Sequence, residues 1–473
     1  MSVVLLEPFI DDRAKWGRFG VEKGYIVPLG MVALYSYLKA RGIPVRLVDT
    51  QFGEYDKGSL RALLSREPRP KVIGIPVFTS TADFSFETAR LCREAAPSAT
   101  IVLGGVHATS LPERTLEECP SADYVVIGEG EHTLHELVAR VLEGKPADDV
   151  PGICRRSGAG PVRNPPRALM DDLDSLPFSA YEELDLPRYV PHPTQYRALP
   201  SYPMLTSRGC PFRCIFCEAH VVHGYKVRRF SVGRVIEEMR VLVRRFGARG
   251  IYFQDSTFTT DREYTLELMG AMVREDFRLQ WACNSRVDRV DPELLAAMKR
   301  AGCWMISYGM ESANQESLDL LKKGITVEQI RKAAEMTERA GISMLCNWIL
   351  ALPGEDRAKV LNTIALAKSI RSDMALFYLP TPCPGSELYR VCRETGGLRE
   401  GAPWTDYLSV DFDNPVYKNP LIPAEEMKSL YRKAYVDYYR DPRYLLKMLL
   451  RLRSMDDIRR CARGLRAVVN AFK

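Results

Sequence analysis

Residues 208–217 have the sequence Arg208-Gly209-Cys210-Pro211-Phe212-Arg213-Cys214-Ile215-Phe216-Cys217, so three cysteines stand in a C-x3-C-x2-C spacing. Three thiolates this close on one loop can hold one compact metal centre. Structural zinc usually takes four ligands in two separated pairs. No fourth cysteine follows at that spacing, although His220 and His223 could complete a zinc site. An iron–sulfur cluster held by three cysteines would instead leave one iron open to a further ligand.

Strand-like and helix-like segments alternate around this loop, from about residue 202 to residue 388. Strands are predicted at Met204–Thr206, Gly250–Gln254, Gln280–Asn284, Met305–Gly309, Ser343–Leu350 and Met374–Leu379. Helices are predicted at Val232–Phe246, Arg262–Glu275, Asp291–Ala301, Gln315–Lys322, Val327–Ala340 and Arg357–Lys368. Six strand–helix units of this length fit a partial (β/α)6 barrel, whose working face lies at the C-terminal ends of its strands.

Apolar strands also alternate with helices in the first 140 residues. Strands are predicted at Val3–Leu6, Val45–Asp49, Val72–Phe78, Thr100–Gly104 and Tyr124–Ile127, and helices at Leu29–Arg41, Ala82–Ala96 and Thr133–Leu142. This order predicts an α/β fold with a doubly wound parallel sheet. Ligands of such sheets bind beyond the C-terminal strand ends. The loops there are small and polar and suit a large flat or phosphorylated ligand; the alternative is that they are only tight turns.

Composition divides the chain into four parts. Residues 1–143 form the first α/β domain. Residues 144–200 are rich in proline and glycine and predict a linker that crosses a surface and could contain a small hairpin. Residues 201–390 form the barrel. Residues 391–473 are expected to be a C-terminal helical region, with helices and no obvious strands from Glu425 onward.

The overall composition is that of an ordinary globular protein. The 473 residues are 46% hydrophobic and 27% charged, which excludes the disordered, collagen-like and coiled-coil classes. A charged residue follows the first apolar residues too early for a signal peptide. No run of about 18 apolar residues exists to span a membrane. Twelve cysteines without a secretion signal indicate a reducing compartment, so we expect a cytoplasmic protein. Four single cysteines near barrel strands are interpreted as structural thiols: Cys283, Cys303, Cys346 and Cys383.

The cysteine loop resembles that of the radical S-adenosylmethionine (SAM) superfamily, whose hallmark is C-x3-C-x2-C with an aromatic residue, here Phe216, before the last cysteine. The resemblance implies that Cys210, Cys214 and Cys217 hold a catalytic [4Fe-4S] cluster whose open iron binds the amino and carboxylate groups of SAM. An electron from the cluster would cleave SAM to a 5′-deoxyadenosyl radical, which abstracts hydrogen from inert carbon. The cofactors carry this step, and the barrel supplies orientation and excludes water.

The resemblance extends along the barrel and implies further contacts with SAM at the strand ends. The candidates are Gln254 and Asp255 for the methionine amino group, Ser285 and Arg286 for the carboxylate, Glu311 for the ribose hydroxyls and Leu350 for the adenine side. Each short segment is a weak signal alone. Their order along the chain and their placement at strand ends make the combination specific.

A doubly wound domain ahead of this barrel resembles the cobalamin-binding subgroup of the superfamily, and the resemblance then covers nearly the whole chain. It implies cobalamin contacts at Gly30, Thr79, Ser80, Gly104, Gly105, His107, Gly128, Glu129 and Gly130. The D-x-H-x-x-G signature that donates a histidine to cobalt is absent, so His107 is expected to hold a turn or a hydrogen bond. A dinucleotide-binding fold fits less well, because Gly128-Glu129-Gly130 lacks the third glycine of G-x-G-x-x-G.

The subgroup carries out two kinds of reaction. Methyl transfer to a carbon is the favoured prediction, and ring formation, ring contraction or oxidation without net methylation is the alternative. A non-enzymatic cobalamin or metal sensor would leave the cysteine loop and Glu311 unexplained. The substrate is expected to be a small molecule or a lipid-like intermediate in the barrel mouth, under a roof that includes Phe377, Tyr378 and residues 380–385. An electron donor such as flavodoxin or ferredoxin is a further implied partner.

The net charge of +6 is concentrated near the C-terminus. Arg440–Lys473 holds ten Lys or Arg and three Asp, a local balance of +7. No nucleic-acid motif accompanies this charge, so no nucleic-acid partner is expected. Tyr444–Arg453 is amphipathic. Its leucines either pack on the barrel or, with the flanking cations, contact an anionic membrane surface, which would make the protein peripheral to the membrane.

Overall fold

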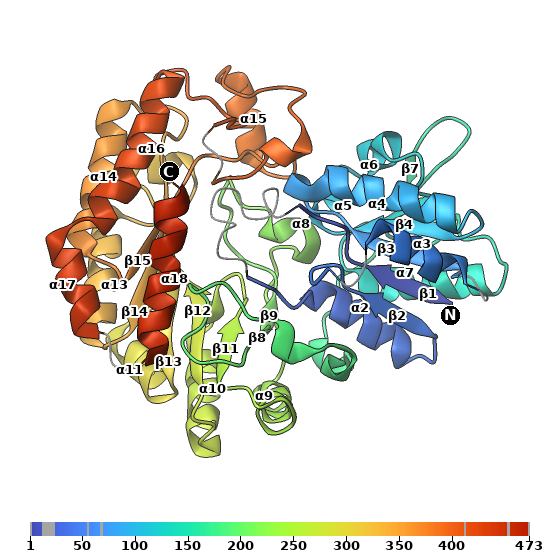
Figure 1. The fold of residues 1–473 in the computed structure, drawn as a ribbon, viewed down its shortest axis with the longest axis horizontal. Helices are drawn as coiled ribbons and strands as arrows, with labels where there is room; N and C mark the ends of the chain where they lie inside the picture. Colours follow the sequence, from blue (N-terminus) through green and yellow to red (C-terminus); the bar gives the residue numbers. More distant parts are fainter. Residues whose placement is uncertain are drawn as a thin grey trace.

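The computed structural model describes residues 2–11, 24–53, 56–66, 70–410, 413–451 and 455–471. Figure 1 shows two α/β halves side by side, the first coloured blue to teal and the second green to red. Each half has its own sheet and its own buried apolar core. No helix among the described residues is long and apolar enough to cross a bilayer.

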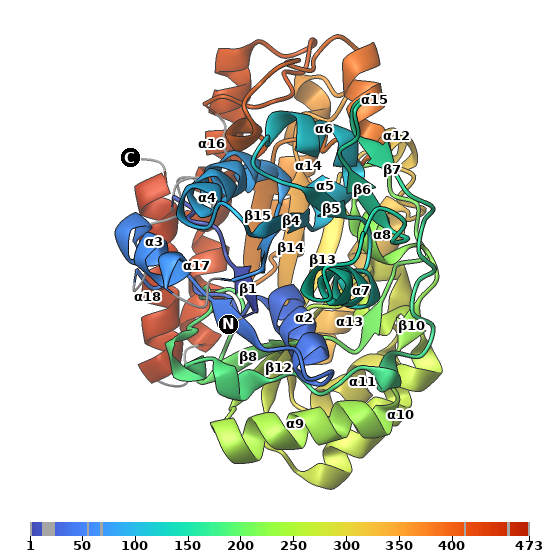
Figure 2. The same ribbon diagram turned by 90° about the vertical axis from the view of Figure 1, so that its right-hand side faces the viewer.

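The first sheet is parallel over five strands in the order β2-β1-β3-β4-β5. These strands are β1 (Val3–Leu6), β2 (Val45–Val48), β3 (Val72–Pro76), β4 (Thr100–Gly104) and β5 (Tyr124–Val126), and the helices are α2 (Leu29–Lys39), α3 (Lys57–Ser65), α4 (Ala82–Ala95), α5 (Val106–Ser110), α6 (Pro112–Glu118) and α7 (Gly130–Leu142). Alternate residues of β1 face opposite helix layers: Val3 and Leu5 pack with α2 and α7, and Val4 and Leu6 pack with α3 and α4. Figure 2 shows both layers and confirms the doubly wound α/β fold.

A hairpin from the predicted linker extends this sheet. The strand β6 (Ile153–Arg155) pairs antiparallel with β5, and β7 (Val162–Arg163) pairs antiparallel with β6. The expected hairpin is therefore present, and it belongs to the first sheet. Farther along, Tyr181 and Leu186 are buried in the core of the second half, so this part of the linker packs against the barrel. The domain boundaries at residues 143 and 200 stay predictions.

The second half is a partial barrel of six parallel strands in the order β15-β14-β13-β12-β11-β8. The strands are β8 (Ser201–Met204), β11 (Gly250–Phe253), β12 (Gln280–Ser285), β13 (Cys303–Glu311), β14 (Ser343–Ile349) and β15 (Met374–Tyr378). The helices outside them are α9 (Val232–Phe246), α10 (Arg262–Glu275), α11 (Pro292–Arg300), α12 (Gln315–Leu320), α13 (Val327–Arg339) and α14 (Arg357–Ile370). The expected (β/α)6 architecture is confirmed, and the barrel is open between β8 and β15.

Tyrosines from α16 (Ala424–Tyr439) cover the open edge at β15. The Tyr435 hydroxyl accepts from the N–H of Phe377 and donates to its carbonyl, both at 3.1 Å. Tyr439 does the same with Ala375, at 3.1 Å and 2.8 Å. Buried backbone groups without partners are costly, and sheet edges expose them. The hydroxyls thus occupy the bonding positions that a seventh strand would fill.

The C-terminal region is less purely helical than expected. It contains α15 (Glu387–Glu394), α16, α17 (Pro442–Arg451) and α18 (Met455–Ala471). Between α15 and α16, however, the chain crosses to the first half, where Trp404, Tyr407 and Val416 join the core of the first sheet. This crossing segment ties the two halves together, which a local helical pattern could not indicate.

Candidate functional site

The three cysteines lie on a loop whose neck is a two-stranded antiparallel ladder of β9 (Ser207–Arg208) and β10 (Arg228–Arg229). Cys210 is buried, and Cys214 and Cys217 are half-buried. The Ala219 N–H donates to Cys217 Sγ at 3.4 Å. Within the described ranges, no three His, Cys, Asp or Glu side chains converge as ligands of a single ion would. Thiolates that each hold a different iron of a cluster do not need to converge in this way.

Two cations face the cysteines from the barrel. Arg286 Nη1 lies 3.7 Å from Cys214 Sγ, and Arg286 Nη2 donates to the Lys323 carbonyl at 2.6 Å. The Lys323 ammonium lies 5.6 Å from the centroid of the Phe216 ring. Burial raises the pKa of Cys214, and the positive charges of Lys323 and Arg286 act against that rise. A negatively charged cluster would be stabilised beside these two cations, so the residues present fit the predicted group.

Glu311 is held by a strained backbone at the end of β13. Its φ is 64°, and the pairing of β13 with β14 shifts register between Gly309 and Glu311. Its carboxylate forms a 2.7 Å ion pair with Lys323, and both side chains are only 7% exposed. A Cβ on Gly309 would lie 2.2 Å from Glu311 Oε1 and 2.8 Å from Lys323 Nζ. Strained residues of this kind gather at functional sites. No local sequence pattern indicated that Lys323 would pair with Glu311.

The two residues that follow β11 have different surroundings. Asp255 is buried and accepts hydrogen bonds from Thr206 Oγ1 at 2.7 Å and Ser207 Oγ at 2.5 Å. Burial raises the pKa of Asp255, and these hydrogen bonds oppose the rise. Its carboxylate therefore anchors the chain that leads into the cysteine loop. Gln254 instead lines a pocket together with Tyr252 of the barrel and Tyr189 of the linker.

Ser285 and Leu350 are buried at the ends of their strands. Ser285 Oγ lies 2.5 Å from Thr259 Oγ1, and the Leu350 N–H donates to the Tyr378 carbonyl at 2.9 Å. The turn after Leu350 is held by the buried carboxylate of Glu355. It accepts from Ser312 Oγ at 2.9 Å and from the Leu352 N–H at 3.1 Å. Because Ser312 follows Glu311, this carboxylate fixes the turn predicted to face the adenine beside the predicted ribose contact.

A polar layer lines the barrel interior near these strand ends, and of its residues only Tyr378 was among the predicted candidates, as part of the roof over the substrate. Tyr252 Oη donates to Asn284 Oδ1 at 2.8 Å. Asn347 Nδ2 donates to Ser307 Oγ at 3.1 Å, and Asn347 Oδ1 accepts from Tyr378 Oη at 3.2 Å. Below them lies an apolar cluster that includes Ala282, Met305 and Leu345. Residues two apart on a strand share a face, so the alternating polar positions were the available signal.

The predicted cobalamin contacts, apart from the exposed Gly30 on α2, gather at the C-terminal edge of the first sheet. His107 is buried there, with Nδ1 3.3 Å from Thr79 Oγ1 and its ring 4.5 Å from that of Trp404. Its Nε2 meets no hydrogen-bond partner among the described residues. Burial lowers the pKa of His107 to about 4. The imidazole is therefore neutral at pH 7 and is packed within the edge, as expected for a hydrogen-bonding role.

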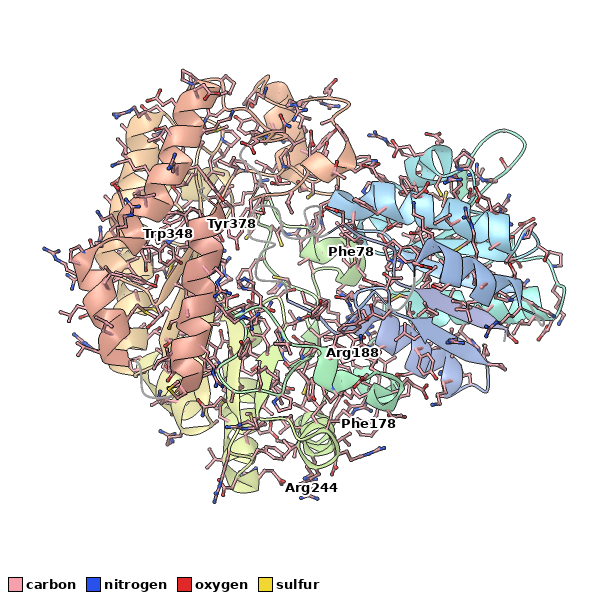
Figure 3. All side chains as sticks on the ribbon, viewed as in Figure 1. Phe78, Phe178, Arg188, Arg244, Trp348 and Tyr378 are labelled. Carbon is pink, nitrogen blue, oxygen red and sulfur yellow. The ribbon has the colours of Figure 1, made fainter. Side chains whose placement is uncertain are left out.

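The same edge presents glycines and one exposed aromatic ring. Gly105 has a φ of 99°, and a Cβ there would lie 2.9 Å from the Val77 carbonyl. Ser80, Gly104 and Gly128 are half-buried. Phe78, which follows β3, is 52% exposed, and in Figure 3 it lies on the side of the first half that faces the barrel, opposite Tyr378. Small residues around a flat apolar ring fit a large planar ligand.

Glu129, a predicted cobalamin contact, lies in a buried ionic cluster with residues of the cysteine loop. Its carboxylate accepts from both terminal nitrogens of Arg228 at 2.8 Å and lies 2.9 Å from His223 Nδ1. Arg208 lies 3.4 Å from Glu129 and 2.5 Å from Glu131. Burial would raise the pKa of Glu129, but the hydrogen bonds from His223 and Arg228 and the arginine charges outweigh it. The pKa is thus well below its ordinary value. Gly130 packs on Leu34 of α2.

A second contact brings the cysteine loop against both halves. Glu218, directly after Cys217, accepts from Ser110 Oγ of α5 at 3.4 Å and from the Gly385 N–H at 3.1 Å. Gly385 belongs to the proline-rich segment that follows β15. Burial raises the pKa of Glu218. The C-terminal edge of the first sheet, the cysteine loop and the end of the barrel therefore meet at one place.

The single barrel cysteines have the surroundings of structural thiols. Cys283 and Cys346 are fully buried, and burial raises the pKa of both, to about 12 for Cys346. Cys303 is also buried. Cys383 is half-buried, and its pKa is raised by burial and by Glu218. Protonated buried thiols are poor nucleophiles and poor metal ligands.

Comparisons with known proteins agree with this geometry. The family model of the radical SAM superfamily matches residues 204–367, and that of the B12 binding domain matches residues 18–138. A protein of Pyrococcus horikoshii named as an uncharacterized methyltransferase is 32% identical over 93% of this chain and 93% of its own length. The anaerobic magnesium-protoporphyrin IX monomethyl ester cyclase of Rubrivivax gelatinosus is 27% identical over 88% of this chain and 74% of the cyclase.

A solved structure has the same architecture along the entire chain. It is the radical SAM methyltransferase TsrM from Kitasatospora setae, determined with cobalamin and a [4Fe-4S] cluster bound. The TM-score is 0.74, with 19% identity over 100% of this chain and 99% of that one. At this identity the match shows a shared fold: a B12-binding half followed by a radical SAM barrel.

Proposed function

Because this chain belongs to the radical SAM superfamily and carries a B12-binding domain, we propose that it transfers a methyl group to an unactivated carbon of a small molecule. Its cofactors are those of the family: a [4Fe-4S] cluster, SAM and cobalamin. When bound, the cluster supplies the electron that cleaves SAM, and cobalamin carries the methyl group. The observation that carries the proposal is the meeting of the first-sheet edge, the cysteine loop and the barrel end at Glu218.

The chain's own residues have three tasks in this proposal. Cys210, Cys214 and Cys217 hold the cluster, and the nearby cations offset its negative charge. Glu311 and Gln254 bind SAM at the strand ends. The linker, which lines one pocket with the barrel strands, helps to exclude water from the reacting groups.

Product analysis with SAM labelled by a deuterated methyl group tests the reaction. The anaerobically reconstituted protein, with about four irons per chain, is incubated with a reductant and cell extract. Methyl transfer predicts a labelled product together with both 5′-deoxyadenosine and S-adenosylhomocysteine. 5′-Deoxyadenosine without label transfer would favour the cyclase-type alternative, which the similarity to the magnesium-protoporphyrin cyclase motivates.

Two variants connect this assay to the cysteine loop. Cys214→Ala is expected to abolish the cluster's absorbance and 5′-deoxyadenosine formation, because one cluster ligand is lost. Cys461→Ala, at a half-buried cysteine of α18 outside the site, is the matched control and should retain both. Zinc in place of iron in the parent protein would contradict the proposal.

A second proposal concerns α17, whose leucine face is exposed. Four leucines of this helix are largely exposed: Leu445 (46%), Leu446 (58%), Leu449 (66%) and Leu450 (73%). The expectation that the leucines pack on the barrel is therefore wrong for these four. Leu452 and Arg453 lie outside the described residues. Met455 and Ile458 on α18 are also exposed. Exposed apolar patches mark contact surfaces, and the basic balance of this segment suits an anionic bilayer. We propose that the otherwise cytoplasmic protein binds such a membrane peripherally.

Vesicle sedimentation tests the membrane contact. Binding to phosphatidylglycerol vesicles at low salt, reduced by high salt and absent with pure phosphatidylcholine, is the expected result. Leu449→Glu should weaken binding, whereas Val273→Glu, at a 49% exposed valine on α10, is the matched control. No binding to either vesicle would contradict the proposal, and a concentration-dependent dimer would assign the face to a second copy of the chain.

A further inference from the structure

The neck of the cysteine loop brings two arginines together. Arg208 on β9 and Arg228 on β10 are directly opposite each other in the antiparallel ladder. Their side chains are 8% and 2% exposed. Like charges at opposite positions of a ladder repel each other, and a buried charge without a partner is strongly destabilising. The neck can therefore close only if anions neutralise both guanidinium groups.

The neutralising anions come from the other half of the molecule. Glu129 and Glu131 lie in the segment between β5 and the first turn of α7, and their side chains are 7% and 5% exposed. Glu129 holds Arg228 through both carboxylate oxygens, at 2.8 Å each, and Glu131 holds Arg208 at 2.5 Å. Arg228 is fixed further by the carbonyls of Met170 at 2.7 Å and His223 at 2.9 Å.

The carboxylate of Glu129 has its acceptor positions occupied by protein groups. Oε1 accepts from Arg228 Nη2 and lies 2.9 Å from His223 Nδ1. Oε2 accepts from Arg228 Nη1 and from the Met170 N–H at 3.2 Å. A carboxylate offers about four acceptor positions in all. A hydrogen bond from a ligand N–H to this carboxylate would therefore have to displace one of these partners, of which Arg228 is buried and His223 is 35% exposed.

From these contacts we infer that Glu129 is a positioning residue that holds the neck of the cysteine loop closed from the first half. Glu131 shares this task through Arg208. Because Glu129 also sits on the sheet edge where the first half would bind its ligand, one short segment fixes the distance between the two cofactor regions. The inference rests on the proposed function only in assigning a cluster to the loop. The closure of the neck itself is a property of the cluster-free chain.

Hydrogen–deuterium exchange of the full-length, cluster-free protein tests the closure directly. Glu129→Gln keeps the shape of the side chain but removes its charge, which leaves the two arginines with Glu131 alone. We expect residues 209–227 to exchange at least about tenfold faster in this variant. Glu136→Gln is the matched control, because Glu136 lies on α7, the helix that Glu129 precedes, and makes half-exposed ion pairs with Arg140 and Arg167. Exchange equal to that of the parent in the Glu129 variant would overturn the inference.

Cofactor content after reconstitution separates positioning of the loop from contact with cobalamin. Glu129→Gln should retain less than about half of the parent's iron per chain but the parent's cobalamin. Loss of cobalamin with unchanged iron and unchanged loop exchange would instead make Glu129 a cobalamin contact. Glu129→Asp, which restores the charge, should recover part of the iron and of the loop protection. If Glu129→Gln does not fold, Glu131→Gln replaces it, because this variant removes only one of the two carboxylates near Arg208. Loop exchange, iron content and cobalamin content are then measured on Glu131→Gln.

A parent protein that binds no cluster would refute the proposed function while leaving the exchange experiment valid. Conversely, a parent with full iron and an unprotected loop in the cluster-free state would refute the inference and leave the proposed function standing. The two failures are therefore distinguishable.

Discussion

Replacing Gly309 with alanine perturbs the ion pair between Glu311 and Lys323 without touching either charge. The added Cβ would lie 2.2 Å from Glu311 Oε1, whereas ordinary contacts begin at 3.4 Å. It would also lie 2.8 Å from Lys323 Nζ. The carboxylate must therefore move by about 1 Å or rotate away, because the backbone at Gly309 is held by its pairing with Asn347 of β14 in a closely packed interior.

The expected consequence is weaker binding of SAM. Hydrogen bonds to a charged group contribute about 1.5–3 kcal/mol, and the predicted role of Glu311 is such a bond to the ribose hydroxyls. Loss of that bond corresponds to an affinity about 10- to 150-fold lower. Iron content should be unchanged, because Gly309 is on β13 and not on the cysteine loop.

Equilibrium dialysis of labelled SAM against the reconstituted protein measures this effect. Gly233→Ala on α9 is the matched control, since the nearest atom to its added Cβ is 4.0 Å away. The control should bind SAM like the parent. A Gly309→Ala protein with normal iron and an SAM affinity equal to that of the parent would refute the placement of Glu311 at the ribose.

Two further predictions concern the core and the first sheet. Tyr435→Phe leaves the buried Phe377 N–H without its acceptor and should lower the free energy of unfolding by about 1–3 kcal/mol; Tyr431→Phe should cost less, because the Phe377 carbonyl keeps the Tyr435 hydroxyl. Urea unfolding compares the two, and equal losses would contradict the account. The pKa of His107 is about 4 when folded and about 6.5 when unfolded, so protonation favours the unfolded chain as the pH falls below 6.5. Between pH 7 and pH 5, protonation of His107 should lower the free energy of unfolding by about 2 kcal/mol. Urea unfolding of the parent and of His107→Gln at both pH values measures this, and the variant should lack this difference of about 2 kcal/mol.

Much of the architecture follows from local sequence patterns. The bounds of α9 and α10 agree with the predicted helices, because each repeats apolar residues along one face. The C-x3-C-x2-C spacing likewise places three thiols on one loop whatever surrounds it. These features depend on residues close together in the chain, so the sequence alone determined them, together with the family they resemble.

Contacts between distant segments were decided only by the tertiary structure. Glu129 and Arg228 are 99 positions apart, and nothing near either residue indicates that they meet, so Glu129 was assigned from sequence to cobalamin alone. The choice of Asp255 or Gln254 as the group that faces a pocket depends on which side chain Thr206 and Ser207 reach. The leucines of α17 looked like core residues, because an amphipathic pattern shows that a helix has an apolar face without showing what covers it. Docking of the two halves decides the first case, and packing within the barrel half decides the other two, since burial and ion pairing depend on which surfaces come together.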